Sequence, residues 1–325
     1  MEPRVTIGMP THNRVEYLPR TINCILSQTY KDFELIIYDD GSSDNTVELL
    51  DSYNDERLSY VSFKNQGPPK PLNYIYKKAK GDFIIILHDH DIFSNVLIEN
   101  CVKVLEENPQ AGFVLPGSGF IDSDGKLNYV ELLDKLPLFN SGRQHLIDIF
   151  SQKKSFNSKF HAQSMVRREA LEGCGFFYND KYGFLSDVDL WIRLLKNNDF
   201  LYLKQPLIKF TRREKNHELN DRSVWVINIL FQIHLDNLNK LKESIFSIKE
   251  VNAFLRVLKR KYFFEISLIF FMELSKGNRL ILNQFDQVNK ENFNYAFTAF
   301  LLKILKLKIV GDLLFLTRTL LKKVT

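Results

Sequence analysis

Short apolar runs alternate with amphipathic segments through the first two thirds of the chain, and each pattern predicts one kind of element. The apolar runs predict strands near residues 5–9, 34–38, 58–63, 83–87 and 112–115, and the amphipathic segments predict helices near 16–28, 44–53, 71–80 and 95–108. Asp44 is expected to cap the second helix. Four repeats of strand and helix indicate right-handed crossovers, so we expect an α/β, Rossmann-like fold with a mostly parallel sheet flanked by helices.

Polar and acidic residues follow three of these apolar runs directly. Thr11 and His12 follow the first run, Asp39 and Asp40 end the second, and the segment 88–91 follows the fourth. Strands of this kind read as buried parallel strands, and ligands of open α/β sheets bind at the carboxyl ends of the strands. We therefore expect the three polar clusters to converge on one site.

The strand and helix rhythm stops near residues 216–221, and the remainder of the chain reads as helices. A chain of 325 residues with 45% hydrophobic residues is long enough for one large domain and an appendage. We expect an α/β domain over residues 1–220 and a helical C-terminal region over 221–325.

Cysteine usage and the first residues both bear on the compartment. The three scattered cysteines fit neither a disulfide framework nor a zinc site, which favours a reducing environment. Residues 1–4 lead directly into a strand and not into the apolar region of a signal peptide. The expected localisation is cytoplasmic.

The net charge of +5 is modest, but lysine and arginine are dense after residue 239. Residues 262–274 are apolar and too short to span a bilayer. Segment 296–325 interleaves lysines with apolar residues, which predicts basic amphipathic helices lying peripherally on the inner, anionic face of the cell membrane. The alternative is a helical appendage that packs on the first domain or on a second subunit, as in a homo-oligomer.

Four segments carry a resemblance to a known family: residues 5–14, 34–44, 84–91 and 186–191. Shorter matches at 27–30, 65–68, 165–168 and 175–177 occur in the same order. Over residues 3–215 the chain resembles the family-2 glycosyltransferases of GT-A fold. The resemblance implies a metal-dependent, inverting, hexosyltransferase-like enzyme of bacterial surface-polysaccharide assembly. Its partners would be a nucleotide-diphosphate sugar, most simply a UDP-sugar, and a hydroxyl of a glycan or lipid-linked glycan, with no nucleic acid partner.

The resemblance implies that Asp40 binds the base of the nucleotide. A carboxylate at a strand end accepts hydrogen bonds from an imide N–H or a ribose hydroxyl. Asp39 is its structural neighbour, and the alternative for residues 40–43 is a turn and helix cap alone. Many relatives carry an arginine where this chain has Leu72, so Lys70 is the replacement phosphate contact or a solvated lysine. The full expected nucleotide-binding set is Pro10, Thr11, His12, Arg14, Asp40 and Lys70.

A divalent cation is also implied, because the leaving pyrophosphate needs its charge neutralised by Mn²⁺ or Mg²⁺ held on carboxylates. Asp91 matches the last aspartate of the family's acidic run, and Asp89 supplies a second carboxylate. Where many relatives have two neighbouring aspartates, this chain has His90 before Asp91. His90 coordinates the ion, which would favour Mn²⁺, or hydrogen-bonds to a ligand without touching the ion; we favour the latter. His217 is a further metal or pyrophosphate candidate, and Arg212 or Arg213 a phosphate contact.

The general base implied by the resemblance is Asp187, just before Leu190 and Trp191. An inverting transfer needs a carboxylate on the acceptor side of the sugar to take the hydroxyl proton. Asp187 is expected at the start of a helix over 187–197, so the alternative role is an N-cap. Asp189 points elsewhere on that helix and is the weaker base.

Two other functions compete with this interpretation. A nucleotidyltransferase acting on sugar phosphates would share the sheet and the metal carboxylates, but it would want a glycine-rich phosphate loop, and residues 10–14 contain no glycine. Loss of Asp91 or Asp187 would have favoured a catalytically inactive binding protein of GT-A fold, but both are present.

Overall fold

The computed structural model describes residues 2–121, 127–131, 137–151, 163–175, 180–211, 224–242 and 244–275. The chain forms two compact units, residues 1–217 and residues 218–325. Each unit is described by itself.

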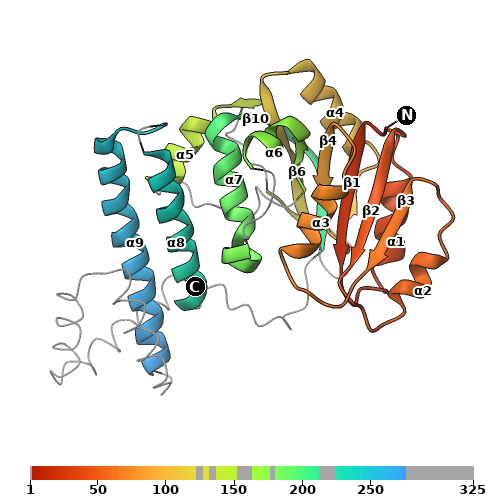
Figure 1. Cartoon of the computed structure of the whole chain (residues 1–325), viewed down its shortest axis with the longest axis horizontal. Helices are drawn as coiled ribbons and strands as arrows, with labels where there is room; N and C mark the ends of the chain where they lie inside the picture. Colours follow the sequence, from red (N-terminus) through yellow and green to blue (C-terminus); the bar gives the residue numbers. More distant parts are fainter. Residues whose placement is uncertain are drawn as a thin grey trace. The chain divides into compact units, whose positions relative to one another are not determined.

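Unit 1 is built on a ten-stranded sheet (Figure 1) with the strand order β3-β2-β1-β4-β9-β6-β10-β5, to which β7 adds on β6 and β8 on β10. The strands are β1 (Val5–Thr11), β2 (Phe33–Asp39), β3 (Leu58–Ser62), β4 (Phe83–Ile86), β5 (Ile92–Phe93), β6 (Ala111–Ile121), β7 (Leu127–Glu131), β8 (Phe139–Asn140), β9 (Met165–Arg167) and β10 (Asp199–Thr211).

Strand direction divides the sheet into two groups. Strands β1, β2, β3, β4, β6 and β10 run one way, and β5, β7, β8 and β9 run the other way. The expected mostly parallel α/β sheet is confirmed, and β9 inserts antiparallel between β4 and β6. The two-residue strands β5 and β8 were not predicted, because two residues cannot show the alternation that marks a strand.

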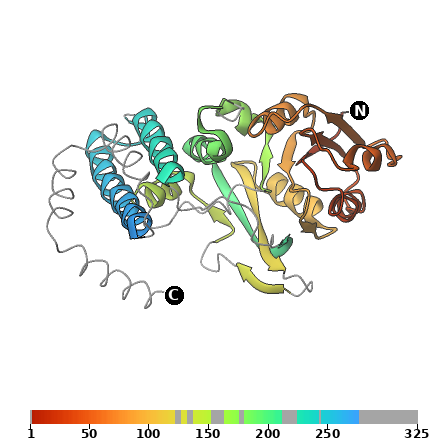
Figure 2. The same ribbon diagram turned by 90° about the horizontal axis from the view of Figure 1, so that it is seen from below.

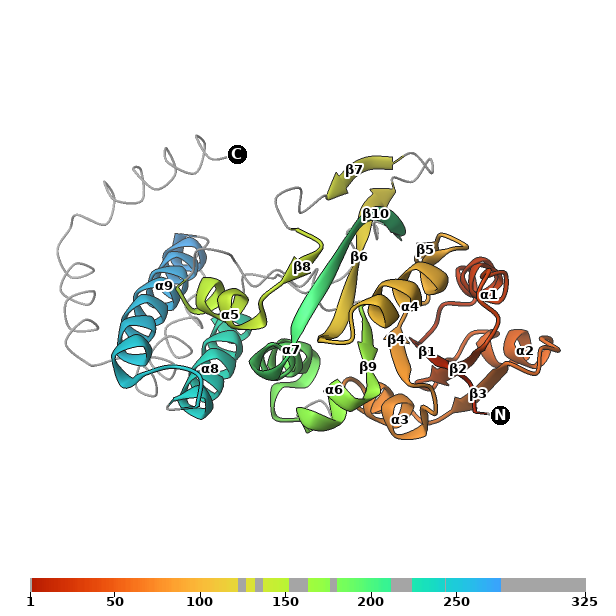
Figure 3. The same cartoon turned by 90° about the horizontal axis from the view of Figure 1, so that it is seen from above.

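The helices of unit 1 cover both faces of the sheet. They are α1 (Leu18–Leu26), α2 (Thr46–Asp51), α3 (Lys70–Lys78), α4 (Leu97–Glu107), α5 (Gly142–Phe150), α6 (Arg168–Gly173) and α7 (Ser186–Asn197), with a 3₁₀ helix, η2 (Asp180–Leu185), before α7. Figure 3 shows α1 and α4 on one side of the sheet and α3, α6 and α7 on the other.

Alternation along β1 explains how both faces are covered. Val5, Ile7 and Met9 are fully buried in the core cluster that includes the apolar faces of α1 and α4. Gly8 points to the opposite face, where a Cβ would lie 2.4 Å from Cγ2 of Ile75 on α3. Glycine at this position therefore lets α3 approach the sheet closely.

Asp44 was expected to be the N-cap of α2, but the N-cap position is held by Asn45. Its carboxylate accepts hydrogen bonds from the backbone N–H groups of Val15, at 3.1 Å, and Thr46, at 3.1 Å. The helix begins at Thr46, two residues after Asp44, and Asp44 ties its start to the loop after β1. These bonds hold the pKa of Asp44 below its usual value, although burial alone would raise it.

Strand β10 carries irregularities in its pairing with β6. It pairs in parallel with β6, and its register shifts between Leu203 and Pro206 and again between Pro206 and Ile208. Such bulges change which residues face a neighbouring strand. The last residue of the strand, Thr211, reaches the polar edge of the sheet, as described below.

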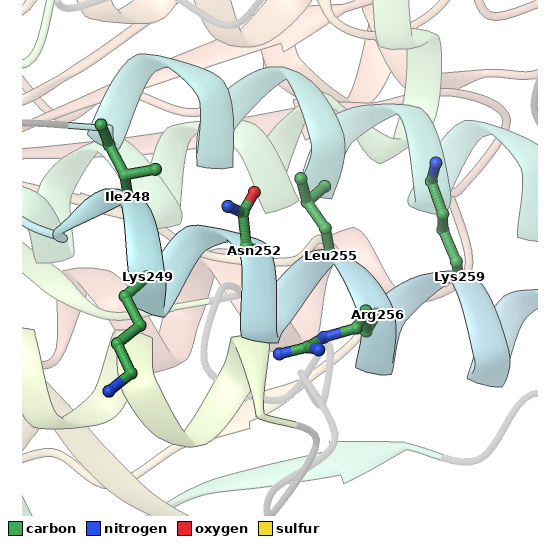
Figure 4. A pocket seen from close by; sticks show the side chains of 6 residues that line it. All are labelled: Ile248, Lys249, Asn252, Leu255, Arg256 and Lys259. Carbon is green, nitrogen blue, oxygen red and sulfur yellow. The ribbon is translucent and has the colours of Figure 1, made fainter.

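Unit 2 begins with two helices, α8 (Val224–Leu241) and α9 (Ile248–Ser275), which lie side by side in Figures 1 and 2. The rings of Phe231 and Tyr262 meet at 5.3 Å between centroids. Ser247 and Glu250 form a reciprocal capping box at the start of α9. An open hollow runs along α9 (Figure 4), lined by Ile248, Lys249, Asn252, Leu255, Arg256 and Lys259.

Within the described ranges, the structure contains no helix that is long and apolar enough to cross a membrane. The predicted basic segment 296–325 lies outside those ranges.

Candidate active site

The carboxyl ends of β1, β2 and β4 lie at one edge of the sheet. Thr11 is in register with Asp39 on β2, and Gly8 with Ile86 on β4. The clusters that follow the strands are in direct contact, because the Thr11 hydroxyl donates to Oδ2 of Asp89 at 2.8 Å. In Figure 1 the arrowheads of β1 and β2 mark this edge.

Asp39 and Asp40 have different partners. Asp39 is fully buried and accepts hydrogen bonds from the backbone N–H of Ser42, at 3.1 Å, and from the hydroxyl of Ser62, at 2.6 Å. Asp40 accepts the backbone N–H groups of Gln66 and Gly67, at 2.8 and 2.9 Å, one on each carboxylate oxygen. Each oxygen of Asp40 keeps a lone pair for a further donor. Asp39 is therefore structural, and Asp40 bridges β2 to the loop after β3.

Gly41 lets this loop approach β2. Its φ angle is +77°, and a Cβ there would lie 2.6 Å from the backbone N of Asn65. A side chain at this position would be strained and would also push the loop away.

His12 is fixed against the same turn. Its Nδ1 lies 3.0 Å from the carbonyl O of Asp40, which only accepts, so Nδ1 carries the proton. Its Nε2 then accepts from the side-chain amide of Asn13 at 3.1 Å. Asn13, with φ of +52°, also accepts the backbone N–H of Ser43 at 2.7 Å. The loops after β1 and β2 are thus clasped together.

The other predicted nucleotide-binding residues lie in these same loops. Pro10 is half-buried at the end of β1, and Arg14 lies in the loop that follows. Lys70 is exposed and is the first residue of α3, just beyond the loop that Asp40 holds.

Asp91 is almost fully buried, with 1% of its side chain exposed. Its Oδ1 accepts the backbone N–H of Thr211 at 2.9 Å, and its Oδ2 faces Nε2 of Gln163 at 2.9 Å and Nδ1 of His88 at 3.2 Å. Burial alone would raise the pKa of Asp91, but the hydrogen bond from His88 and the nearby charges of His88 and His90 hold it below the usual value.

Gln163 was missed by the sequence analysis. It is fully buried, has a φ angle of +80°, and its amide oxygen accepts the backbone N–H of His88 at 3.3 Å while its NH₂ donates to Asp91. A non-glycine residue at positive φ is uncommon and clusters at functional sites. No sequence signal marks it, because its position depends on the antiparallel pairing of the following strand, β9, with β4.

Three side chains of this loop offer ligand atoms that lie within 4.8 Å of one another: His88, His90 and Asp91. Asp89 is not in that group. Its two oxygens meet Nδ1 of His90 at 2.7 Å and the Thr11 hydroxyl at 2.8 Å. His217, Arg212 and Arg213 lie outside the described residues.

Asp187 lies in the first turn of α7, where its Oδ1 accepts the backbone N–H of Val188 at 2.8 Å. Desolvation by burial raises the pKa of Asp187 to about 6, opposed by its backbone hydrogen bonds and by the charge of His88. His88, whose charge acts on Asp187, also contacts Asp91. A carboxyl group with a pKa near neutrality suits a general base.

Asp189 is engaged elsewhere. It is 1% exposed, and its Oδ2 accepts from Nε of Arg193 at 2.9 Å. Arg193 also donates to the carbonyl O of Cys174, just after α6, so this pair ties α7 to the end of α6.

Comparison with known proteins places these observations in a family. The sequence model of the family described as glycosyl transferase family 2 matches residues 6–175. An uncharacterized glycosyltransferase of Rickettsia bellii is 32% identical over 136 residues, which cover 41% of this chain and 19% of that protein. The GalNAc(5)-diNAcBac-PP-undecaprenol beta-1,3-glucosyltransferase of Campylobacter jejuni is 29% identical over 206 residues, which cover 61% of this chain and 62% of that protein.

Solved structures share the fold. S. aureus TarS 1-349 in complex with UDP-GlcNAc matches with a TM-score of 0.65 at 18% identity, over 88% of this chain and 81% of that chain. The same fragment in complex with UDP matches with a TM-score of 0.56 at 16% identity, over 89% of each chain. The curated relatives are longer than the part that matches, since this chain spans about a fifth of the Rickettsia protein.

Proposed function

Since the chain belongs to glycosyl transferase family 2, we propose that it moves a sugar from a nucleotide-diphosphate sugar to an acceptor hydroxyl, with inversion at the anomeric carbon. We assign this activity to the α/β domain of residues 1–220. The observation that carries the proposal is the contact between the polar ends of the parallel strands at one edge of the sheet, where Asp40 and Asp91 lie in different environments. The raised pKa of Asp187 supports it as the base.

The nucleotide side of the site is the pair of clasped loops after β1 and β2. Asp40 keeps one lone pair on each carboxylate oxygen, directed by its bonds to Gln66 and Gly67, for an imide N–H or a ribose hydroxyl. Thr11, His12 and Pro10 line the neighbouring strand end. Half-buried Arg14 and exposed Lys70 are cations of these loops and supply charge for the phosphates.

The donor set beside Asp91 fits a divalent cation. A buried carboxylate and two imidazoles offer ligand atoms within 4.8 Å of one another, and an ion such as Mn²⁺ accepts both oxygen and nitrogen. A bound Mn²⁺ or Mg²⁺ would neutralise the charge that develops on the leaving diphosphate. Gln163 and Thr211 orient the Asp91 carboxylate for this task.

Asp187 takes the proton of the acceptor hydroxyl. As that proton moves to the carboxylate, the acceptor oxygen forms its bond to the anomeric carbon. The bond from that carbon to the diphosphate oxygen breaks, and the nucleoside diphosphate leaves with the electron pair. A base with a pKa of about 6 is deprotonated at neutral pH and still basic enough to accept the proton.

The names of similar proteins support a narrower substrate class. TarS was crystallised with UDP-GlcNAc, and the name of the Campylobacter relative describes transfer onto an undecaprenol-linked saccharide. We propose a UDP-sugar donor and a glycan or lipid-linked glycan acceptor of the bacterial surface. Action at the cytoplasmic face of the membrane, with peripheral contact through 296–325 or with that segment in a homo-oligomer, stays a prediction.

A ligand panel tests the proposal. UDP-sugars are screened with the whole chain and Mn²⁺ by thermal shift, and a donor that raises the melting temperature is then incubated with lipid-linked saccharides. We expect release of UDP and a product of inverted anomeric configuration by NMR. Release of pyrophosphate from a nucleoside triphosphate and a sugar phosphate would instead identify a nucleotidyltransferase. Binding without turnover on any acceptor would identify an inactive binding protein.

A further inference from the structure

The His90 ring is held in one orientation by its neighbour in the chain. Its Nδ1 lies 2.7 Å from Oδ1 of Asp89, and a carboxylate only accepts, so Nδ1 carries a proton. In the neutral imidazole, Nε2 then carries the lone pair. Within the described part of the chain, this Nε2 has no hydrogen-bond partner, and it faces Oδ1 of Asp91 at 3.8 Å.

Asp89 stands outside the group of side chains whose ligand atoms lie within 4.8 Å of one another, which is His88, His90 and Asp91. One carboxylate oxygen bonds to Nδ1 of His90 and the other to the hydroxyl of Thr11. The arrangement of Asp89, His90 and the facing atom matches the pattern in which a carboxylate orients a histidine that binds metal through its other nitrogen.

The separation between His90 and Asp91 suits a shared ion. At 3.8 Å, Nε2 of His90 and Oδ1 of Asp91 are too far apart for a hydrogen bond. Two ligand atoms that each lie about 2.1 Å from one ion are separated by roughly 3 to 4 Å. The side chain of His90 is also more exposed than that of Asp91, at 10% against 1%, so a cation that enters from solvent has better access to the imidazole.

We propose that His90 binds the divalent cation through Nε2, together with Asp91, and that Asp89 is a positioning residue that orients His90. This reverses the roles expected from sequence, in which Asp89 was a ligand and His90 was not. The inference rests on the proposed function, since the same site serves both. An imidazole nitrogen favours Mn²⁺ over Mg²⁺, which prefers oxygen, so this centre selects a first-row transition ion.

Electron spin echo spectroscopy of bound Mn²⁺ tests the proposal, because it detects a nitrogen nucleus bonded directly to the ion. The whole chain is loaded with Mn²⁺ and UDP, once with natural histidine and once with ¹⁵N-labelled histidine. We expect ¹⁴N modulation that changes to a ¹⁵N pattern on labelling. A wild-type spectrum without histidine nitrogen, or a protein that binds no Mn²⁺, overturns the proposal without any variant.

Three substitutions assign the nitrogen and the role of Asp89. His90→Gln should remove the modulation. The matched control His88→Gln should keep it, because Nδ1 of His88 is already engaged with Oδ2 of Asp91 at 3.2 Å, although the two rings stack with centroids 5.6 Å apart. Asp89→Asn keeps an acceptor for Nδ1, so the modulation should remain while Mn²⁺ affinity falls about 10–100-fold. If the signal is lost in His88→Gln but kept in His90→Gln, the nitrogen bonded to the ion belongs to His88, and the proposal is overturned.

Cation preference gives a second measurement. In His90→Asp all the offered ligand atoms of this pair are oxygens, so the ratio of Mn²⁺ to Mg²⁺ affinity should fall on the order of tenfold. The free Mn²⁺ signal during titration with Mg²⁺ measures this ratio, and an unchanged ratio contradicts the inference. These spectra need no sugar transfer. If nitrogen is bonded to Mn²⁺ but the protein transfers no sugar, only the proposed function is refuted. If the protein transfers sugar but Mn²⁺ has only oxygen ligands, only the assignment of His90 as a ligand is refuted.

Discussion

Replacing Asp187 by asparagine should lower activity and raise stability at the same time. The substitution keeps the size of the side chain and an acceptor for the backbone N–H of Val188, but it removes the group that takes the proton. Transfer should fall by about 10²–10⁴, the usual contribution of a general base. In the wild type, kcat/KM should rise about tenfold per pH unit below pH 6 and level off above it, following the pKa of about 6.

The stability effect follows from the same pKa with a definite sign. Below the unfolded pKa of about 3.8, Asp187 is neutral in both states and contributes nothing. As pH rises from about 3.8 to about 6, the unfolded protein loses this proton more readily than the folded protein, so stability decreases, and it levels off above about 6. The rise in pKa from 3.8 to about 6 corresponds to about 3 kcal/mol as an upper limit. Asp187→Asn should therefore be more stable than wild type at pH 8, by at most that amount, and equally stable near pH 4.

Two measurements check this reasoning. Urea unfolding at pH 4 and pH 8, without nucleotide or divalent cation, gives the stability difference, and initial rates of nucleoside diphosphate release give the pH profile. Asp189→Asn is the matched control two residues along α7. It weakens the buried pair with Arg193 and should lower stability by about 1–3 kcal/mol without moving the pH profile. If Asp187→Asn transfers sugar at near wild-type rates, or keeps the acid limb of the profile, Asp187 is not the base.

Three further substitutions test the rest of the site. Asp91→Ala should abolish the strengthening of UDP binding by Mn²⁺, whereas Asp40→Ala should weaken UDP binding with or without Mn²⁺. Calorimetry with and without Mn²⁺ distinguishes the two variants. Equal effects of both variants on UDP affinity in both titrations would contradict the assignment. Gln163→Ala removes a donor to Asp91 and an acceptor for His88, so Mn²⁺ affinity should fall about 10–100-fold, while exposed Gln144→Ala on α5 should change nothing in the same titration. Gly41→Ala should lower the free energy of unfolding by about 2 kcal/mol, because of its φ of +77° and the nearby Asn65 backbone. Gly173→Ala, where no atom lies within 4 Å of the added Cβ, should be neutral or slightly stabilising, and equal losses in both variants would refute the conformational explanation.

The sequence predicted the strand ends because long apolar runs mark them clearly. The expected runs at 5–9, 34–38 and 83–87 became β1, β2 and β4, whose parallel registers bring Thr11, Asp40 and Asp91 to one edge. The helix expected at 187–197 became α7, which begins one residue earlier.

The partners of those residues could not be predicted. Gln163 and Thr211 reach Asp91 from strands far along the chain, and their contacts depend on how β9 and β10 pair with their neighbours. The orientation of His90 by Asp89 depends on side-chain rotamers, which neither spacing nor periodicity reveals.

The end of β10 makes the loop of residues 88–91 sensitive to the length of a distant strand. Thr211 donates its backbone N–H to Asp91 and its hydroxyl to the carbonyl O of His90, and Arg20 donates to that same carbonyl. The residue that occupies this place is set by the two register shifts near Pro206. A single-residue deletion between Asp199 and Thr211 would move a different backbone amide opposite Asp91 and turn alternate side chains to the other face. A homologue that retains every acidic residue of the site would thus still lose the site through the deletion of one codon in β10, a strand that carries none of these acidic residues.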